Sequence, residues 1–132
     1  MISYSSSITF LYYNDLEYGH QFMRDVLELS LVMDQGFAAI YQISATSYLG
    51  IVNRNDRVVP GDTLVSFNTT DVSLAWERMQ TQRVVGLTPM ETIVSIPLKS
   101  FFFSDEEGHR FEIQEFLDPT HRQQFLDQGV FQ

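Results

Sequence analysis

The fold of this chain is decided at positions 101–116, which read FFFSDEEGHRFEIQEF. An aromatic first arm, an acidic turn ending in Gly108 and a second apolar arm predict a β-hairpin, because glycine readily takes the positive φ of tight turns. Side chains alternate along a strand, so Arg110, Glu112 and Gln114 share one face of the second arm. A carboxylate that points into a half-buried face is costly unless something pairs with it or uses it. Glu112 is therefore the first candidate functional residue.

The rest of the chain repeats one order of elements twice. A β-branched and aromatic strand is followed in each half by a helix cap, Asp15 or Asp71, and then by a helix and further strands. The two caps lie 56 positions apart, and the same offset relates Met23 to Met79. Few residues are identical between the halves, so the repeat is one of pattern and predicts two similar modules.

The pattern gives the boundaries of these modules. The strands expected after the first helix lie at 37–43 and 47–52. The residues 1–132 are expected to form one domain, made of a module at 8–53, a linker at 54–62, a module at 63–117 and a short tail helix at 118–132. The tail helix is expected because Asp118 is a good cap and Pro119 is favoured at the first helical position.

The hairpin at 103–113, with the helix openings at 13–17 and 69–72, resembles the vicinal oxygen chelate superfamily. That group includes glyoxalase I, bleomycin-resistance proteins and extradiol dioxygenases. The resemblance implies an α+β fold, in which two βαβββ modules form cup-shaped mixed sheets with helices outside, and it implies a homodimer. In metal-using members, the glutamate that matches Glu112 is a metal ligand.

The other metal-ligand positions that the resemblance implies carry no donor in this chain. They correspond to Ile8, Leu64 and a place near Leu49 or Gly50. A divalent metal needs about three or four protein ligands, so Glu112 alone is insufficient. The nearest alternatives are poor ligands: Ser7, Thr9, Thr63 and Ser66. We therefore predict that the protein has no metal site and no cofactor.

The three histidines do not supply the missing ligands. His20 falls on the first helix and His121 in the tail, whereas His109 is out of phase with Glu112 and should face the opposite side. Each is expected to be a surface or helix-flank histidine.

Composition narrows the possible partners. The 132 residues carry eight basic and seventeen acidic side chains, a net charge of −9, and no cysteine. Phosphate binding requires clustered Lys and Arg, so nucleic acid is not expected, whereas a cationic ligand would suit this charge. No apolar run is long enough to span a membrane and no signal peptide is recognisable, so we expect no membrane partner and a cytoplasmic location.

Strand alternation and hairpin pairing predict the lining of the cup. They give a largely apolar pocket with a few converging polar groups, which is typical of small-molecule sites. The predicted ligand-binding residues are Phe10, Tyr12, Tyr41, Ser66, Phe102, Arg110, Glu112 and Gln114. One hypothesis is that Arg110 neutralises Glu112 and that the ion pair replaces the metal. The alternative is that Arg110 reaches solvent or bonds to Glu106 or Glu107 in the turn.

Two functions follow from this reading, and a third stays open. The first is metal-independent binding of a small, partly apolar molecule, as in bleomycin-resistance proteins. The second is a glyoxalase-like lyase or isomerase, related to lactoylglutathione lyase, with Glu112 as catalytic base or metal ligand. The third is an interaction module whose cup is filled by its own side chains.

Overall fold

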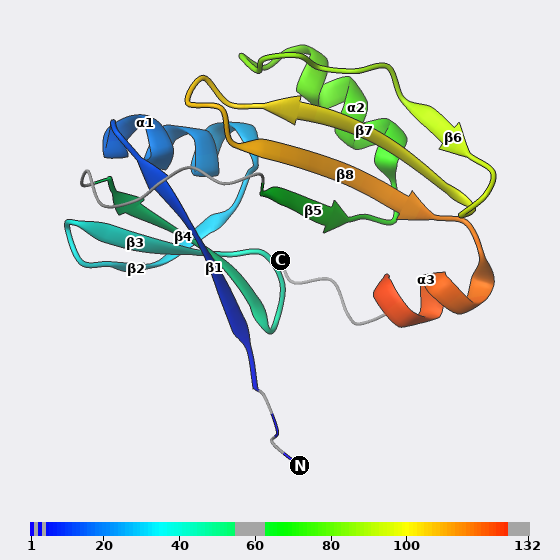
Figure 1. Ribbon diagram of the computed structural model, residues 1–132, viewed down its shortest axis with the longest axis horizontal. Helices are drawn as coiled ribbons and strands as arrows, with labels where there is room; N and C mark the ends of the chain where they lie inside the picture. The colour runs from blue at the N-terminus through cyan, green and yellow to red at the C-terminus, as the bar shows by residue number, and fades with distance from the viewer. Residues whose placement is uncertain (2, 4, 55–62, 127–132) are drawn as a thin grey trace. The chain divides into compact units, whose positions relative to one another are not determined.

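The computed structural model describes residues 1, 3, 5–54 and 63–126. The chain divides into two compact units, one reaching Gly61 and the other beginning at Asp62. Each unit contains one four-stranded mixed sheet (Figure 1). The expected linker lies outside the described residues apart from Arg54. Within the described part, none of the helices has the length and hydropathy of a membrane span.

The first unit consists of a strand, a helix and three further strands. Its elements are β1 (Ser7–Tyr13), α1 (Leu16–Gln21), the π-helical segment η1 (Phe22–Val26), β2 (Ser30–Asp34), β3 (Ala38–Gln42) and β4 (Ser47–Asn53). The sheet order is β1-β4-β3-β2, with β1 parallel to β4 and the other neighbours antiparallel.

Local chemistry explains how the helix of this unit begins and what it covers. The Asp15 carboxylate accepts a hydrogen bond from the backbone N of Tyr18 at 3.1 Å, which satisfies one free donor of the first turn. The helix packs on β1 and β4. Phe22 and Met23 are buried, as is Leu49 on β4. The helix therefore covers one face of the first sheet.

Strand β2 was not placed by the sequence. Its register shifts between Leu31 and Met33, which marks a β-bulge, and all five of its residues are exposed. A bulge interrupts the alternation of side chains, and an exposed edge strand has no apolar face to bury. The period-2 pattern that reveals a strand is therefore missing here.

The second unit repeats the arrangement. Its elements are β5 (Leu64–Asn68), α2 (Val72–Gln80), β6 (Glu91–Ile93), β7 (Leu98–Ser104), β8 (Arg110–Phe116) and α3 (Pro119–Phe125). The sheet order is β5-β8-β7-β6, with β5 parallel to β8 and the other neighbours antiparallel. The predicted hairpin is β7 and β8, and Gly108 in its turn has a φ of +89°.

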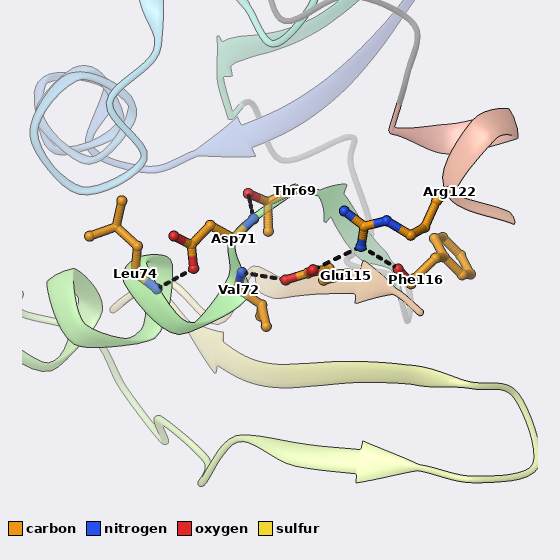
Figure 2. Close-up of polar contacts among 7 residues, drawn as sticks. All are labelled: Thr69, Asp71, Val72, Leu74, Glu115, Phe116 and Arg122. Carbon is orange, nitrogen blue, oxygen red and sulfur yellow. Dashed lines mark hydrogen bonds and ion pairs between the residues drawn. The ribbon is translucent and has the colours of Figure 1, made fainter. Parts of the chain in front are cut away.

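Polar contacts fix both helices of this unit to β8 (Figure 2). At the start of α2, Asp71 Oδ1 accepts from Leu74 N at 3.1 Å, and Glu115 Oε1 of β8 accepts from Val72 N at 3.0 Å. The other oxygen of Glu115, Oε2, accepts from Arg122 Nη1 of α3 at 2.8 Å. Glu115 thus satisfies a donor at the N-terminus of α2 and holds α3 at the same time.

The expected fold is confirmed: the order βαβββ occurs twice, with the parallel and antiparallel pairs in the same places. Helix α3 begins after its cap, Asp118, whose carboxylate accepts from Thr120 N at 2.9 Å. The part of the predicted tail helix at 127–132 lies outside the described residues.

Candidate functional site

One face of the second sheet packs on α2, and the other face carries Glu112. Glu115 bonds to Val72 N of α2, so side chains in phase with Glu115 on β8 point toward that helix. Phe111 and Ile113 are in this phase and are both buried. Glu112 is out of phase with them and therefore lies on the face away from α2.

Strand register places Glu112 at the centre of a row of three predicted residues. Ser66 on β5 and Phe102 on β7 lie opposite it on either side. Ser66 Oγ donates a hydrogen bond to Glu112 Oε1 at 2.5 Å. Glu112 is 9% exposed, whereas Ser66 is exposed and Phe102 is half-buried. Among the described residues, Glu112 Oε2 has no hydrogen-bond partner, so one oxygen of a nearly buried carboxylate stays available.

A second polar row lies beside the first. Gln114 is opposite Asn68 on β5 and Ser100 on β7. Gln114 Nε2 donates to Asn68 Oδ1 at 3.0 Å, and Ser100 is 2% exposed. The structure thus brings five of the predicted ligand-binding residues onto one face of one sheet: Ser66, Phe102, Arg110, Glu112 and Gln114.

Arg110 and Glu112 share this face without pairing. No ion pair among the described residues includes either of them. Arg110 is exposed and lies opposite Leu64 and Ser104 on the neighbouring strands. The hypothesis that Arg110 neutralises Glu112 is therefore corrected: the carboxylate has a hydroxyl partner, and the guanidinium faces solvent.

Phe10 and Tyr12 belong to the first unit and lie on the face of its sheet away from α1. Phe10 is opposite Gly50 on the parallel strand β4 and is 45% exposed, and Tyr12 is half-buried. A Cβ at Gly50 would lie 2.4 Å from Phe10 Cδ1, so the ring covers the glycine closely. Ile8 is on the same face and is 41% exposed.

Tyr41 is placed apart from the other predicted residues. It lies opposite Leu49, on the face of the first sheet that α1 covers, and has no exposed surface. Its hydroxyl lies 2.6 Å from His20 Nδ1. Burial raises the pKa of Tyr41, and the positive charge and hydrogen bond of Arg24 oppose that rise. Tyr41 is a core residue whose hydroxyl makes polar contacts with His20 and Arg24.

His20 and His109 occupy different environments. His20 is 8% exposed, so the expectation that it lies at the surface or helix flank is wrong. His109 lies in the turn before β8, where its Nδ1 is 2.9 Å from Asp105 Oδ2. Asp105 is 1% exposed and also accepts from Glu107 N and His109 N, so it organises the hairpin turn. Sequence reasoning overlooked Asp105, because an Asp in an acidic turn gives no sign of burial.

The donor set around Glu112 does not fit a divalent metal. Its strand neighbours offer one serine hydroxyl and one phenyl ring. Leu64, on the strand that should supply another ligand, is aliphatic and 41% exposed. Within the described residues, no group of three or more His, Cys, Asp or Glu side chains could hold a metal ion. The arrangement can accept hydrogen bonds or a proton at Glu112, and it presents a ring and a cation nearby.

Comparison with known proteins places this geometry among solved structures. No family model matches the sequence, and no curated protein matches it. The fosfomycin resistance protein FosX from Mesorhizobium loti is similar, with a TM-score of 0.67, 20% identity, and coverage of 93% of this chain and 99% of that chain. FosX from Listeria monocytogenes, in complex with manganese(II) and sulfate, gives a TM-score of 0.71, 20% identity, and coverage of 94% and 98%.

A further similar structure is the lactoylglutathione lyase of Agrobacterium tumefaciens. It gives a TM-score of 0.65 and 19% identity, and the match covers 82% of this chain and 90% of that chain. At these identities the likeness concerns the fold. The chain therefore has the paired βαβββ fold of the vicinal oxygen chelate superfamily, the fold that its closing hairpin resembles.

Proposed function

We propose that this protein binds a small, partly apolar molecule at the Glu112 face of the second sheet, without a metal. The observation that carries the proposal is the burial and the hydrogen bonding of Glu112. It is 9% exposed, and one serine hydroxyl is its only hydrogen-bond partner among the described residues. Burying a carboxylate is costly when its acceptor sites are left unfilled, and a ligand with donor groups would fill them.

The surroundings of Glu112 support a ligand that is partly apolar. Phe102 lies directly opposite on β7 and is half-buried, so a ring face can contact a flat or aliphatic group. Leu64 on β5 is 41% exposed on the same face. A few polar groups among apolar side chains are the usual composition of such sites.

The similar structures support small-molecule binding by this fold. One FosX structure from Listeria monocytogenes contains manganese(II) and a dihydroxypropylphosphonic acid. In this chain the positions implied for two further ligands carry Ile8 and Leu64, which cannot coordinate a metal. We infer that the fold is used here for binding, as in a resistance-type sequestering protein.

Thermal shift measurements across a library of cationic, neutral and anionic compounds test this proposal. We expect stabilisation by a subset of compounds, with no added effect of manganese or zinc, since bound ligand raises the apparent stability. The variant Glu112→Gln should lose most of the shift. The matched control is Glu77→Gln, which removes the same charge from an exposed position on α2. A tightly bound stoichiometric metal in purified protein would overturn the proposal.

The second candidate is a lyase or isomerase in which Glu112 acts as a base. It is favoured by the free Oε2 of Glu112, since a general base must reach the proton that it removes. The test is the formation or breakdown of lactoylglutathione by wild type and Glu112→Gln. Turnover that the substitution lowers at least about 100-fold would establish this function in place of simple binding.

We also propose that the protein is a cytoplasmic homodimer, which rests on the family resemblance. Light scattering after gel filtration should give twice the monomer mass, and cell fractionation should recover the protein with soluble markers. Elution at the monomer mass over a wide concentration range would contradict the dimer.

A further inference from the structure

We propose, resting on the proposed function, that the ligand is a zwitterion with an apolar body. Its ammonium group contacts Glu112, its anionic group contacts Arg110, and its apolar part lies against Phe102.

The first step is the placement of the two charges. Arg110 and Glu112 lie two positions apart on β8, so their side chains leave the same face about 7 Å apart along the strand. Glu112 is flanked by Ser66 and Phe102, and Arg110 by Leu64 and Ser104. A molecule with an ammonium and a carboxylate separated by a few bonds can reach both side chains at once.

The second step is that these charges are not used within the described part of the protein. Arg110 makes no ion pair or hydrogen bond to another described residue, and Glu112 Oε2 has no partner there. An ammonium group carries three donors and makes strong bonds to a carboxylate. A guanidinium presents donors that match a carboxylate in two parallel hydrogen bonds. An ammonium group would therefore complement Glu112, and a carboxylate would complement Arg110.

The third step excludes ligands of a single charge. A net charge of −9 repels an anion, which Arg110 alone would have to overcome. A simple cation is attracted by the protein but meets Arg110 two positions from Glu112. A zwitterion has no net charge and satisfies both groups, so it fits this face better than either.

A series of three related compounds tests the inference. L-phenylalanine carries both charges, 2-phenylethylamine lacks the carboxylate, and 3-phenylpropionate lacks the ammonium, while all three share the phenyl ring. Affinity is measured by calorimetry and by amide chemical shifts at Ser66, Arg110 and Glu112. We expect L-phenylalanine to bind at least about tenfold more tightly than either single-charge compound.

Two variants separate the two contacts. Arg110→Gln should reduce the affinity for L-phenylalanine about tenfold and leave that for the amine unchanged or higher. Glu112→Gln should reduce the affinity for L-phenylalanine about tenfold and leave that for 3-phenylpropionate unchanged or higher. Arg83→Gln removes an exposed cation elsewhere in the second unit and should not change the affinity for any of the three compounds.

Several outcomes would overturn the inference and leave the proposed function intact. The first is that 2-phenylethylamine binds as tightly as L-phenylalanine, and the second is that Arg110→Gln weakens the binding of both compounds equally. The third is that neutral library compounds bind at Glu112 while the three probes do not. If no library compound binds at all, the proposed function itself fails.

Discussion

The two sheets have the same strand arrangement but carry different kinds of side chain at equivalent positions. In each unit the first and last strands are parallel neighbours, and one opposed pair of residues lies at the middle of the face away from the helix. In the first unit this pair is Phe10 and Gly50, and in the second it is Ser66 and Glu112. A ring covers a glycine in one unit, whereas a hydroxyl bonds to a carboxylate in the other. The repeated architecture is therefore apolar in one half and has a polar anchor in the other.

Packing at Gly50 explains why the first unit carries no second carboxylate. A Cβ at this position would lie 2.4 Å from Phe10 Cδ1 and 2.6 Å from Phe10 Cε1. Any side chain at position 50 thus requires the ring to move. The first unit closes the position with its own side chain, and the second leaves Glu112 Oε2 available to a ligand.

The largest effect is expected when the first unit is given the carboxylate of the second. Gly50→Glu should lower the free energy of unfolding by about 3 kcal/mol, because the new side chain displaces the Phe10 ring and its charge lacks a partner. Denaturant unfolding at pH 7 measures the change.

The double variant Gly50→Glu with Phe10→Ser is the control for this prediction. It recreates the hydroxyl–carboxylate pair of Ser66 and Glu112, so it should recover at least about 1 kcal/mol relative to Gly50→Glu alone. If the two substitutions simply add their costs, the two positions are not equivalent and the comparison fails.

Much of the second unit could be predicted from sequence because its signals are local. The hairpin alternates in polarity and has a glycine at the turn, so the face of Glu112 and its pairing with Phe102 followed from nearby residues. The bond from Ser66 to Glu112 joins residues 46 positions apart, and only the register of the parallel strands determines it. A long-range register of this kind is not encoded in local periodicity.

The first unit was harder to predict because its central strand does not alternate. Positions 38–41 read AAIY, which is apolar throughout, so the pattern could not show which face Tyr41 occupies. The structure places Tyr41 on the helix side, and Ile40 is the residue opposite Gly50. The fold was predictable from the repeat of elements. The composition of the site was not, because a strand made only of apolar residues does not show which of its side chains lie on which face of the sheet.

The reverse exchange should have a smaller effect. Ser66→Ala removes the only hydrogen-bond donor to Glu112 among the described residues, and we expect a loss of about 1–2 kcal/mol in unfolding free energy. Adding Glu112→Leu makes the pair apolar, as in the first unit, and should restore most of that loss. Denaturant midpoints measure both changes, with Ser104→Ala on the same face as a matched control. A double variant less stable than Ser66→Ala would contradict the argument.

Tyr41 allows a comparison of the helix-covered faces. It lies opposite Leu49, in the position that Phe103 occupies opposite Phe111 in the second unit. Tyr41→Phe makes the two positions alike and removes the contact with His20, so we expect a loss of about 1 kcal/mol at pH 7.

The pH dependence of the Tyr41 effect has a definite sign. The pKa of Tyr41 is raised by burial above its ordinary value of 10.0, so the phenol is neutral in both states below that pH. Above pH 10 the unfolded chain loses the proton while the folded protein keeps it, and the wild type is destabilised. The loss caused by Tyr41→Phe should therefore shrink between pH 8 and pH 11. If Tyr41→Phe causes the same loss of unfolding free energy at pH 8 and at pH 11, the ionisation of Tyr41 does not contribute to the pH dependence of stability.

The smallest effect is expected at α3, which follows the last strand of the second sheet. Arg122→Gln removes the ion pair with Glu115, whose side chains are 33% and 18% exposed, so the loss should be about 0.5 kcal/mol. The bond from Val72 N to Glu115 Oε1 remains, so hydrogen exchange should accelerate at the amides of α3 and stay unchanged in α2. Equal acceleration in both helices would mean that Glu115 couples them into one cooperative structure, with Arg122 holding the carboxylate in place for α2 as well.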